Sequence, residues 1–107
     1  MSRGFLGKQI DGIWHTGVLA FGYEYYFGGG ICQGPPGMTP YGNPYKTIKI
    51  GFTSKKKWDF EKWLQTISHK FNMSTYDLLS NNCNNFADAC VVYLTEKNIP
   101  SYITGLP

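Results

Sequence analysis

A segment rich in glycine and proline, Gly28–Pro44, most constrains how this chain can fold. It reads GGGICQGPPGMTPYGNP and holds six glycines and four prolines, a composition that predicts a long loop without a regular element. Strands are predicted before it at Gly12–Phe21 and Tyr23–Phe27, and after it at Tyr45–Phe52. The segment is therefore either a functional loop or a simple crossover between strands.

The first strong helical pattern follows the last predicted strand. Thr53 or Ser54 is the predicted cap, and the helix is expected to end near Lys70. The lysines Lys55–Lys57 at its start favour a solvated face, because their charge opposes the helix dipole. The apolar residues that recur at helical spacing are Phe60, Trp63, Leu64, Ile67 and Phe71.

A second helix is predicted from Cys83 to about Lys97. The two residues before it, Asn81 and Asn82, are strong N-cap residues. With strands in the first half of the chain and helices in the second, the fold class is α+β. We expect a small antiparallel sheet that packs against helices.

Length and composition restrict the class of protein further. The 107 residues are 42% hydrophobic and 17% aromatic, which indicates one globular domain over residues 1–107. The net charge is +3, and the basic residues are scattered apart from Lys55–Lys57, so no nucleic-acid partner is expected. No apolar run is long enough to span a bilayer, so no membrane partner is expected either.

The cysteines indicate a reducing compartment. Their number is odd, at three, and they lack the spacing of a disulfide framework. The N-terminal residues lack the apolar core of a signal peptide. We therefore expect a cytoplasmic or nuclear location.

No metal or cofactor is expected. No two of the candidate ligands have the C-x-x-C or H-x₃₋₅-H spacing of a zinc site. The run Gly28–Gly30 lacks the Lys-Ser/Thr ending of a phosphate-binding loop. The candidate ligands are His15, His69, Cys32, Cys83 and Cys90.

Cys83 is the candidate nucleophile. At the start of a helix, a thiol lies among unpaired backbone N–H groups and at the positive end of the helix dipole, which favours the thiolate. The competing interpretation is an inert core cysteine, because Cys83 also lies on the apolar stripe of its helix. That stripe consists of Cys83, Phe86, Ala87, Cys90 and Leu94.

A cysteine nucleophile needs a base or a cation beside it, and histidine can be both. His69 lies off the apolar stripe of its helix, so it is predicted to be a surface residue. His15 lies on a predicted buried strand, where it is either a hydrogen-bonded core histidine or the partner of Cys83. A helix start that packs against the middle of a sheet would bring the two together.

Five stretches of the chain, taken in order, resemble the PPPDE family. This family consists of circularly permuted papain-fold thiol peptidases whose best-known members are desumoylating isopeptidases. The blocks G-I-W-H-T and N-C-N-x-F are the most specific of these. The stretches are LGKQIDGIWHTG at Leu6–Gly17, YYFGGGI at Tyr25–Ile31, GPPG at Gly34–Gly37, NNCNNF at Asn81–Phe86 and IPSYITGLP at Ile99–Pro107.

The resemblance implies a permuted papain-like fold and a Cys–His dyad. Cys83 is then the nucleophile, and His15 is the general base that holds the thiolate. The implied reaction is hydrolysis of the isopeptide bond between the C-terminal glycine of SUMO or ubiquitin and a lysine of the conjugated protein. Family members are similar in often forming homodimers, so association is also implied.

Five further residues are candidates for binding substrate. Trp14, Gly28 and Gly29 could form the walls of a slot for the Gly-Gly tail of the modifier. Asn82 and Asn85 could donate to the oxyanion or cap the helix, and capping is favoured. The backbone N–H of Cys83 suits the oxyanion geometrically.

One departure from the family pattern is evident. In the family a strand of the type V-x-L-x-V-Y-D-L usually precedes the LGKQ stretch, and we expect this N-terminal family strand to be missing here, because the first strand predicted is Gly12–Phe21. Two other functions stay open. One is a protein thioesterase, such as a depalmitoylase, that uses the same dyad. The other is a non-catalytic module that binds ubiquitin-like modifiers.

Overall fold

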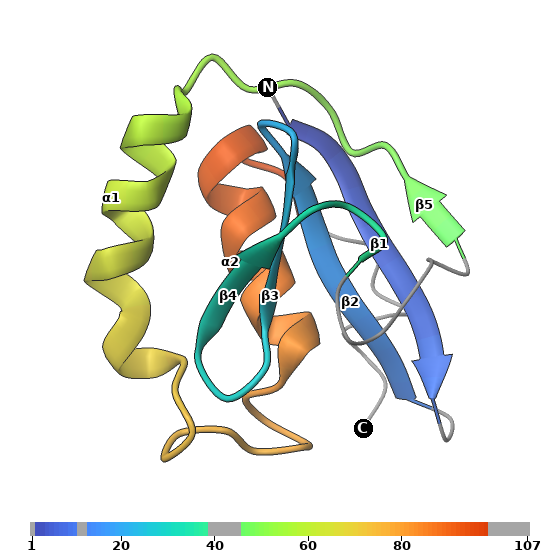
Figure 1. Cartoon of the computed structure of the whole chain (residues 1–107), viewed down its shortest axis with the longest axis vertical. Helices are drawn as coiled ribbons and strands as arrows, with labels where there is room; N and C mark the ends of the chain where they lie inside the picture. Colours follow the sequence, from blue (N-terminus) through green and yellow to red (C-terminus); the bar gives the residue numbers. More distant parts are fainter. Residues whose placement is uncertain (1, 11–12, 39–45, 99–107) are drawn as a thin grey trace.

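The computed structural model describes residues 2–10, 13–38 and 46–98, with side chains from residues 16–38 and 48–98. It has an antiparallel sheet of five strands in the order β4-β3-β2-β1-β5, and the helices α1 and α2 cover it (Figure 1). The predicted α+β class is confirmed, as is the antiparallel sheet packed against helices. The strands are β1 Ser2–Ile10, β2 Ile13–Ala20, β3 Tyr23–Phe27, β4 Ile31–Gly34 and β5 Lys46–Ile48.

The N-terminal part of the chain differs from the prediction, because β1 occupies residues expected to lack a regular element. It pairs with β2 on one side and with β5 on the other, so it is an interior strand. Its sequence has no clear alternation of apolar and polar residues. A strand with partners on both sides is fixed by its ladder hydrogen bonds, and this tertiary pairing overrides a weak local pattern.

The glycine- and proline-rich segment also contains a strand, so the prediction of a loop throughout residues 28–44 is wrong. Residues 28–30 form a tight turn in which Gly29 has φ of 91° and the Gly28 N–H donates to the Gly30 carbonyl (3.0 Å). The turn returns the chain as β4, whose residues pair with those of β3. The composition predicted the turn but not the short edge strand after it.

The strand predicted at residues 45–52 is shorter in the structure. Of residues 46–52, only Lys46–Ile48, which form β5, pair with β1, and residues 49–52 follow without regular structure. Lys49 instead places its Nζ over the Phe52 ring, 4.1 Å from the centroid. The alternation of apolar residues thus extends to Phe52, beyond Ile48, the last residue that pairs with β1, and so predicted too long a strand.

Helix α1, Lys57–Ile67, begins after the predicted caps and continues as a 3₁₀ turn at Ser68–Lys70. Its N-cap is Lys56, whose backbone N–H donates to Asp59 Oδ2 (3.3 Å). Thr53 lies outside the helix and instead accepts from the Lys55 N–H (3.1 Å). The predicted apolar stripe is confirmed, since its five residues are buried or half-buried against the core.

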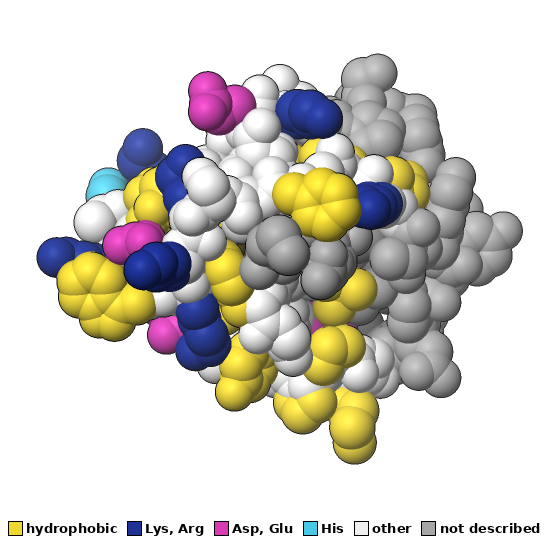
Figure 2. Space-filling view, turned by 90° about the horizontal axis from the view of Figure 1, so that it is seen from above, with side chains coloured by type: hydrophobic (Ala, Val, Ile, Leu, Met, Phe, Trp, Pro, Cys, Tyr) yellow, Lys and Arg dark blue, Asp and Glu magenta, His cyan; other side chains and the backbone are white. Residues whose placement is uncertain are grey.

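Three lysines in α1 or just before it make cation–π contacts with aromatic rings. Lys55, Lys57 and Lys62 place their Nζ atoms 4.9 Å from the ring centroids of Tyr93, Tyr23 and Trp58, respectively. Figure 2 shows basic and hydrophobic side chains interspersed on the face seen from above. Cation–π contacts of this kind let long cationic side chains cover apolar surface while their charged ends stay in water.

Helix α2, Cys83–Thr95, agrees with the prediction to within two residues at its C-terminal end. All five residues of its predicted stripe are buried. Phe86 packs its ring 5.4 Å from that of Phe71 and 6.4 Å from that of Phe27 on β3, while Phe60 of α1 meets Tyr25 of the same strand at 4.8 Å. Both helices therefore cover the same face of the sheet.

Neither helix in the described residues combines the length and apolar composition needed to cross a membrane.

Candidate active site

The start of α2 is fixed by its cap. Cys83 is the first residue of the helix, and Asn82 is the N-cap. The Asn82 Oδ1 accepts from the N–H groups of Asn84 (2.9 Å) and Asn85 (3.4 Å), and the Asn85 Oδ1 accepts from the Asn82 N–H (2.8 Å). The Asn82 Nδ2 donates to the Leu78 carbonyl (2.6 Å). Both side chains are engaged in this capping box, as the favoured interpretation predicts.

Cys83 is more buried than a reactive thiol at a helix start is expected to be. It is 7% exposed and belongs to the hydrophobic core cluster. Burial raises the pKa of its thiol, whereas the helix position alone predicts a lowered pKa. The difference arises because the sequence predicts the helix dipole but not the depth at which the sulfur lies.

Several hydrogen bonds oppose the effect of burial on Cys83. The hydroxyl and backbone N–H of Thr16 and the N–H groups of Cys83 and Asn84 lie where they lower the pKa of the thiol, but by less than burial raises it. Cys90 provides a contrast within the same helix, because its pKa is raised well above the ordinary value by burial with no such compensation. Cys83 therefore differs from Cys90 in having nearby donors that partly offset the effect of burial on its pKa.

Thr16 and Asn84 join the strand β2 to the first turn of α2, and neither is among the residues predicted for the site. The Thr16 hydroxyl donates to Asn84 Oδ1 at 2.7 Å and lies 3.3 Å from the Cys83 carbonyl oxygen. Thr16 is 0% exposed and Asn84 is 2% exposed. Thr16 could have been found as a polar residue on a predicted buried strand, because buried polar groups need partners. Asn84 lies off the predicted apolar stripe and gave no such signal.

His15 precedes Thr16 on β2, so the structure brings the residue next to His15 into contact with the start of α2. The backbone of His15 pairs with Lys8 of β1, and that of Trp14 pairs with Gln9. The side chains of both residues lie outside the described part of the chain. In Figure 1, β2 begins and α2 begins at the same lower end of the molecule.

The remaining predicted residues lie at different distances from this end of the fold. Gly28 and Gly29 form the β3–β4 turn, and a Cβ added at Gly29 would meet the Met73 Cε at 3.9 Å. The turn therefore lies beside the segment before α2. His69 is exposed in the 3₁₀ turn, as predicted. Cys32 is half-buried and donates its thiol to the Gly30 carbonyl (3.6 Å).

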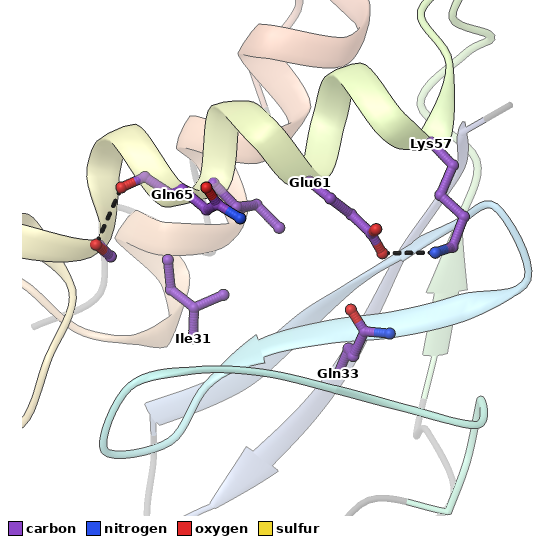
Figure 3. Close-up of a pocket in the computed structure, with 7 residues that line it drawn as sticks. Ile31, Gln33, Lys57, Glu61 and Gln65 are labelled. Carbon is purple, nitrogen blue, oxygen red and sulfur yellow. Dashed lines mark hydrogen bonds and ion pairs between the residues drawn. The ribbon is translucent and has the colours of Figure 1, made fainter.

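A separate hollow of about 510 Å³ lies between α1 and the β3–β4 hairpin. Figure 3 shows Gln33 of β4 facing the ion pair between Lys57 Nζ and Glu61 Oε2 (2.6 Å). No lining residue is a thiol or a histidine, so this hollow lacks the chemistry of the start of α2. The lining residues are Ile31, Gln33, Lys57, Glu61, Leu64, Gln65 and Ser68.

Comparisons with known proteins agree with these residues. The family model described as "PPPDE putative peptidase domain" matches residues 1–107. Desumoylating isopeptidase 1 of Homo sapiens is 40% identical over 95% of this chain and 62% of its own length. The Xenopus laevis protein of the same name is 38% identical over 100% of this chain and 69% of its own length. A Caenorhabditis elegans homolog is 32% identical over 89% of this chain and 31% of its length.

The chain thus spans about three-fifths of the length of the human relative that it matches. The matched region includes every residue of the site just described, from β2 to the first turn of α2. This chain belongs to the PPPDE putative peptidase family.

Proposed function

We propose that this protein is a thiol isopeptidase that removes SUMO from lysine side chains, with Cys83 as nucleophile and His15 as general base. The observation that carries the proposal is the contact between Thr16 of β2 and the first turn of α2. Because His15 is the adjacent residue on β2, this contact places the backbone of the strand near His15 against the helix start that carries Cys83. The relatives named desumoylating isopeptidase support the choice of reaction and modifier. Ubiquitin conjugates are a second substrate class with the same C-terminal glycine.

The proposed reaction has two halves. His15 takes the proton of the Cys83 thiol, and the sulfur attacks the carbonyl carbon of the modifier's C-terminal glycine. The tetrahedral intermediate collapses when His15 gives that proton to the lysine amine, which leaves, and a thioester joins the glycine to Cys83. Water then attacks the thioester with His15 as base, which releases the glycine carboxylate and restores the thiol.

The oxyanion of the intermediate needs a donor close to the sulfur. We propose the backbone N–H of Cys83, because the nucleophile's own N–H lies next to the attacked carbonyl. The N–H groups of Asn84 and Asn85 donate to Asn82 Oδ1, and the Asn82 amide donates to the Leu78 carbonyl. The capping box therefore supports the helix start rather than the oxyanion.

The wider proposal follows the family. His15 precedes Cys83 in the chain, and this order is expected of a circularly permuted papain-like fold. Trp14, Gly28 and Gly29 are proposed to line the slot for the modifier's Gly-Gly tail. We also propose that the protein forms homodimers and acts in the cytoplasm or the nucleus, which light scattering and tagged-protein imaging would test.

The test is cleavage of a peptide that carries SUMO on a lysine side chain. We expect release of SUMO by the wild type, no release by Cys83→Ser or His15→Ala, and normal release by the matched control Cys32→Ser. Cleavage by either dyad variant would falsify the assignment. Hydrolysis of an acylated cysteine peptide but not of the SUMO conjugate would instead indicate a thioesterase, and binding of SUMO without hydrolysis would indicate a non-catalytic module.

A further inference from the structure

Asn84 has a polar atom that the fold leaves without a partner. Its Nδ2 is buried and makes no hydrogen bond. Its Oδ1, on the same amide, accepts the Thr16 hydroxyl at 2.7 Å and lies 4.0 Å from the Cys83 sulfur, which is the outer limit for a thiol donor. A buried donor without a partner is costly, so native proteins rarely keep one without a function.

This arrangement suits the neutral thiol better than the thiolate, because the Thr16 hydroxyl is directed at the Asn84 amide oxygen. With a thiol, Asn84 Oδ1 is the acceptor for both the Thr16 hydroxyl and the Cys83 S–H group. After the proton leaves for His15, the sulfur is an anion that needs donors, yet the Thr16 hydroxyl is directed at the amide oxygen. The only proton of that hydroxyl cannot serve both acceptors.

The two ends of the amide have nearly the same shape. If the Asn84 amide turns by half a rotation, Nδ2 takes the place of Oδ1 at hydrogen-bond distance from the Thr16 oxygen. Nδ2 then donates to that oxygen, and the hydroxyl proton becomes available to the sulfur. The nitrogen thus gains a partner beside the thiolate, while the amide oxygen gives up the Thr16 hydroxyl and takes the former place of the nitrogen.

We propose that Asn84 and Thr16 form a relay that reorients when Cys83 ionises, in which the Asn84 amide donates to the Thr16 hydroxyl and this hydroxyl donates to the thiolate. Asn84 is a positioning residue that acts through Thr16. The inference rests on the proposed function for its base, because His15 receives the thiol proton. It concerns the ionisation of Cys83, which can be measured without any modifier.

Three other titratable side chains described on β3 and α2, those of Tyr25, Glu24 and Asp88, have hydrogen-bond partners other than Cys83. Tyr25 donates to Glu61 Oε2 (3.3 Å) on α1, and Glu24 accepts from the Gly37 N–H (3.0 Å). On α2, the Asp88 carboxylate accepts from the Asn98 amide (3.0 and 3.2 Å). His15 is the titratable residue next to Thr16, so its variant is measured as well.

The experiment is the rate of iodoacetamide alkylation of each cysteine against pH, resolved by mass spectrometry. Thr16→Val removes the hydroxyl at nearly constant shape, and we expect about tenfold slower alkylation of Cys83 below its midpoint, since a hydrogen bond to a charged group is worth about one pKa unit. Thr16→Ser keeps the hydroxyl and should restore the wild-type profile. His15→Ala measures how much of the profile depends on the base.

Asn84→Asp and Asn85→Asp form the matched pair. Each adds one negative charge at the same helix start, but only the first replaces the amide that donates to Thr16, while an aspartate at position 85 still accepts in the capping box. We expect a clearly larger upward shift of the Cys83 midpoint in Asn84→Asp. Equal shifts in the two variants, or a wild-type profile in Thr16→Val, would overturn the relay.

Cys90 reports on folding in the same samples, because it is 0% exposed and alkylates only when the core opens. A variant in which Cys90 is not alkylated is folded, and its rate of Cys83 alkylation against pH can be compared with that of the wild type. If Thr16→Val exposes Cys90, the Asp pair and Thr16→Ser decide the result. If the alkylation profiles confirm the relay but the protein cleaves no SUMO conjugate, only the proposed function is rejected. If the protein cleaves SUMO conjugates but the profiles contradict the relay, only the relay is rejected.

Discussion

Replacing Asn82 by alanine tests how the fold holds the nucleophile in place. Asn82 is 3% exposed, and its side chain makes three hydrogen bonds, two from the N–H groups of the first helical turn and one to the Leu78 carbonyl. Loss of an N-cap costs about 1 kcal/mol. Loss of the bond to Leu78 adds about 1 kcal/mol, so the free energy of unfolding should fall by about 2 kcal/mol in total.

Thermal unfolding followed by circular dichroism measures this effect. For a domain of this size, a loss of about 2 kcal/mol lowers the midpoint by about 8 °C. Asn82→Asp keeps the acceptor but not the donor, so it should lose about half as much. The matched control is Asn98→Ala, which removes an exposed amide bound to Asp88 and should change the midpoint little. Equal midpoints for Asn82→Ala and Asn98→Ala would refute the reasoning.

Three further predictions concern the sheet and the core. Gly17→Ala should lower the free energy of unfolding by about 1–3 kcal/mol, because its Cβ would lie 3.0 Å from Glu24 Oε2 and 3.2 Å from a backbone oxygen; Gly34→Ala, with nothing within 4 Å, is the control in urea titrations. Burial raises the pKa of Glu24 above its ordinary value of 4.5. The protonated carboxyl group therefore contributes fully to stability below pH 4.5, and this contribution is lost as pH rises through the folded-state pKa. Glu24→Gln keeps an acceptor for the Gly37 N–H and should abolish this difference between urea titrations at pH 4 and pH 7. Phe86→Ala should cost about 3–5 kcal/mol because the ring is 0% exposed, and an unchanged urea midpoint would contradict its place in the core.

The helices could be predicted because their signals are local. The apolar stripe of α1 and the cap of α2 follow from spacing and from the side chain of Asn82 alone. The predicted start of α1 is too early, because Thr53 has the side chain of an N-cap but accepts from the Lys55 N–H outside the helix. Which of several residues caps a helix depends on the path of the preceding loop in the folded protein, and the local sequence does not determine that path.

The strands were harder to predict because their partners are distant in the sequence. β1 has weak alternation and is held between β2 and β5, while β4 follows a glycine turn within a segment whose composition argued for a loop. Ladder hydrogen bonds can compensate for poor strand propensity, so composition alone underestimates short strands.

The candidate site was predictable in its residue types and incomplete in its environment. Cys83 at a helix start follows from the cap, but the burial that raises its pKa depends on how deeply α2 packs into the core. Thr16 and Asn84 are 68 residues apart in the sequence, so the sequence could not show that they share a hydrogen bond. The sequence predicts the chemistry of a site, and packing decides which neighbours tune it.

The central claim is that Cys83 attacks the C-terminal glycine of a modifier with the help of His15. SUMO that carries a propargylamide at that glycine tests this claim directly, because only a nucleophilic thiol bound next to the tail reacts with it. Intact-mass and peptide mass spectrometry should find one SUMO per chain, attached to Cys83, with no adduct in Cys83→Ser and a much slower reaction in His15→Ala. An adduct on Cys32 or Cys90, or no adduct with either SUMO or ubiquitin probes, would contradict the account.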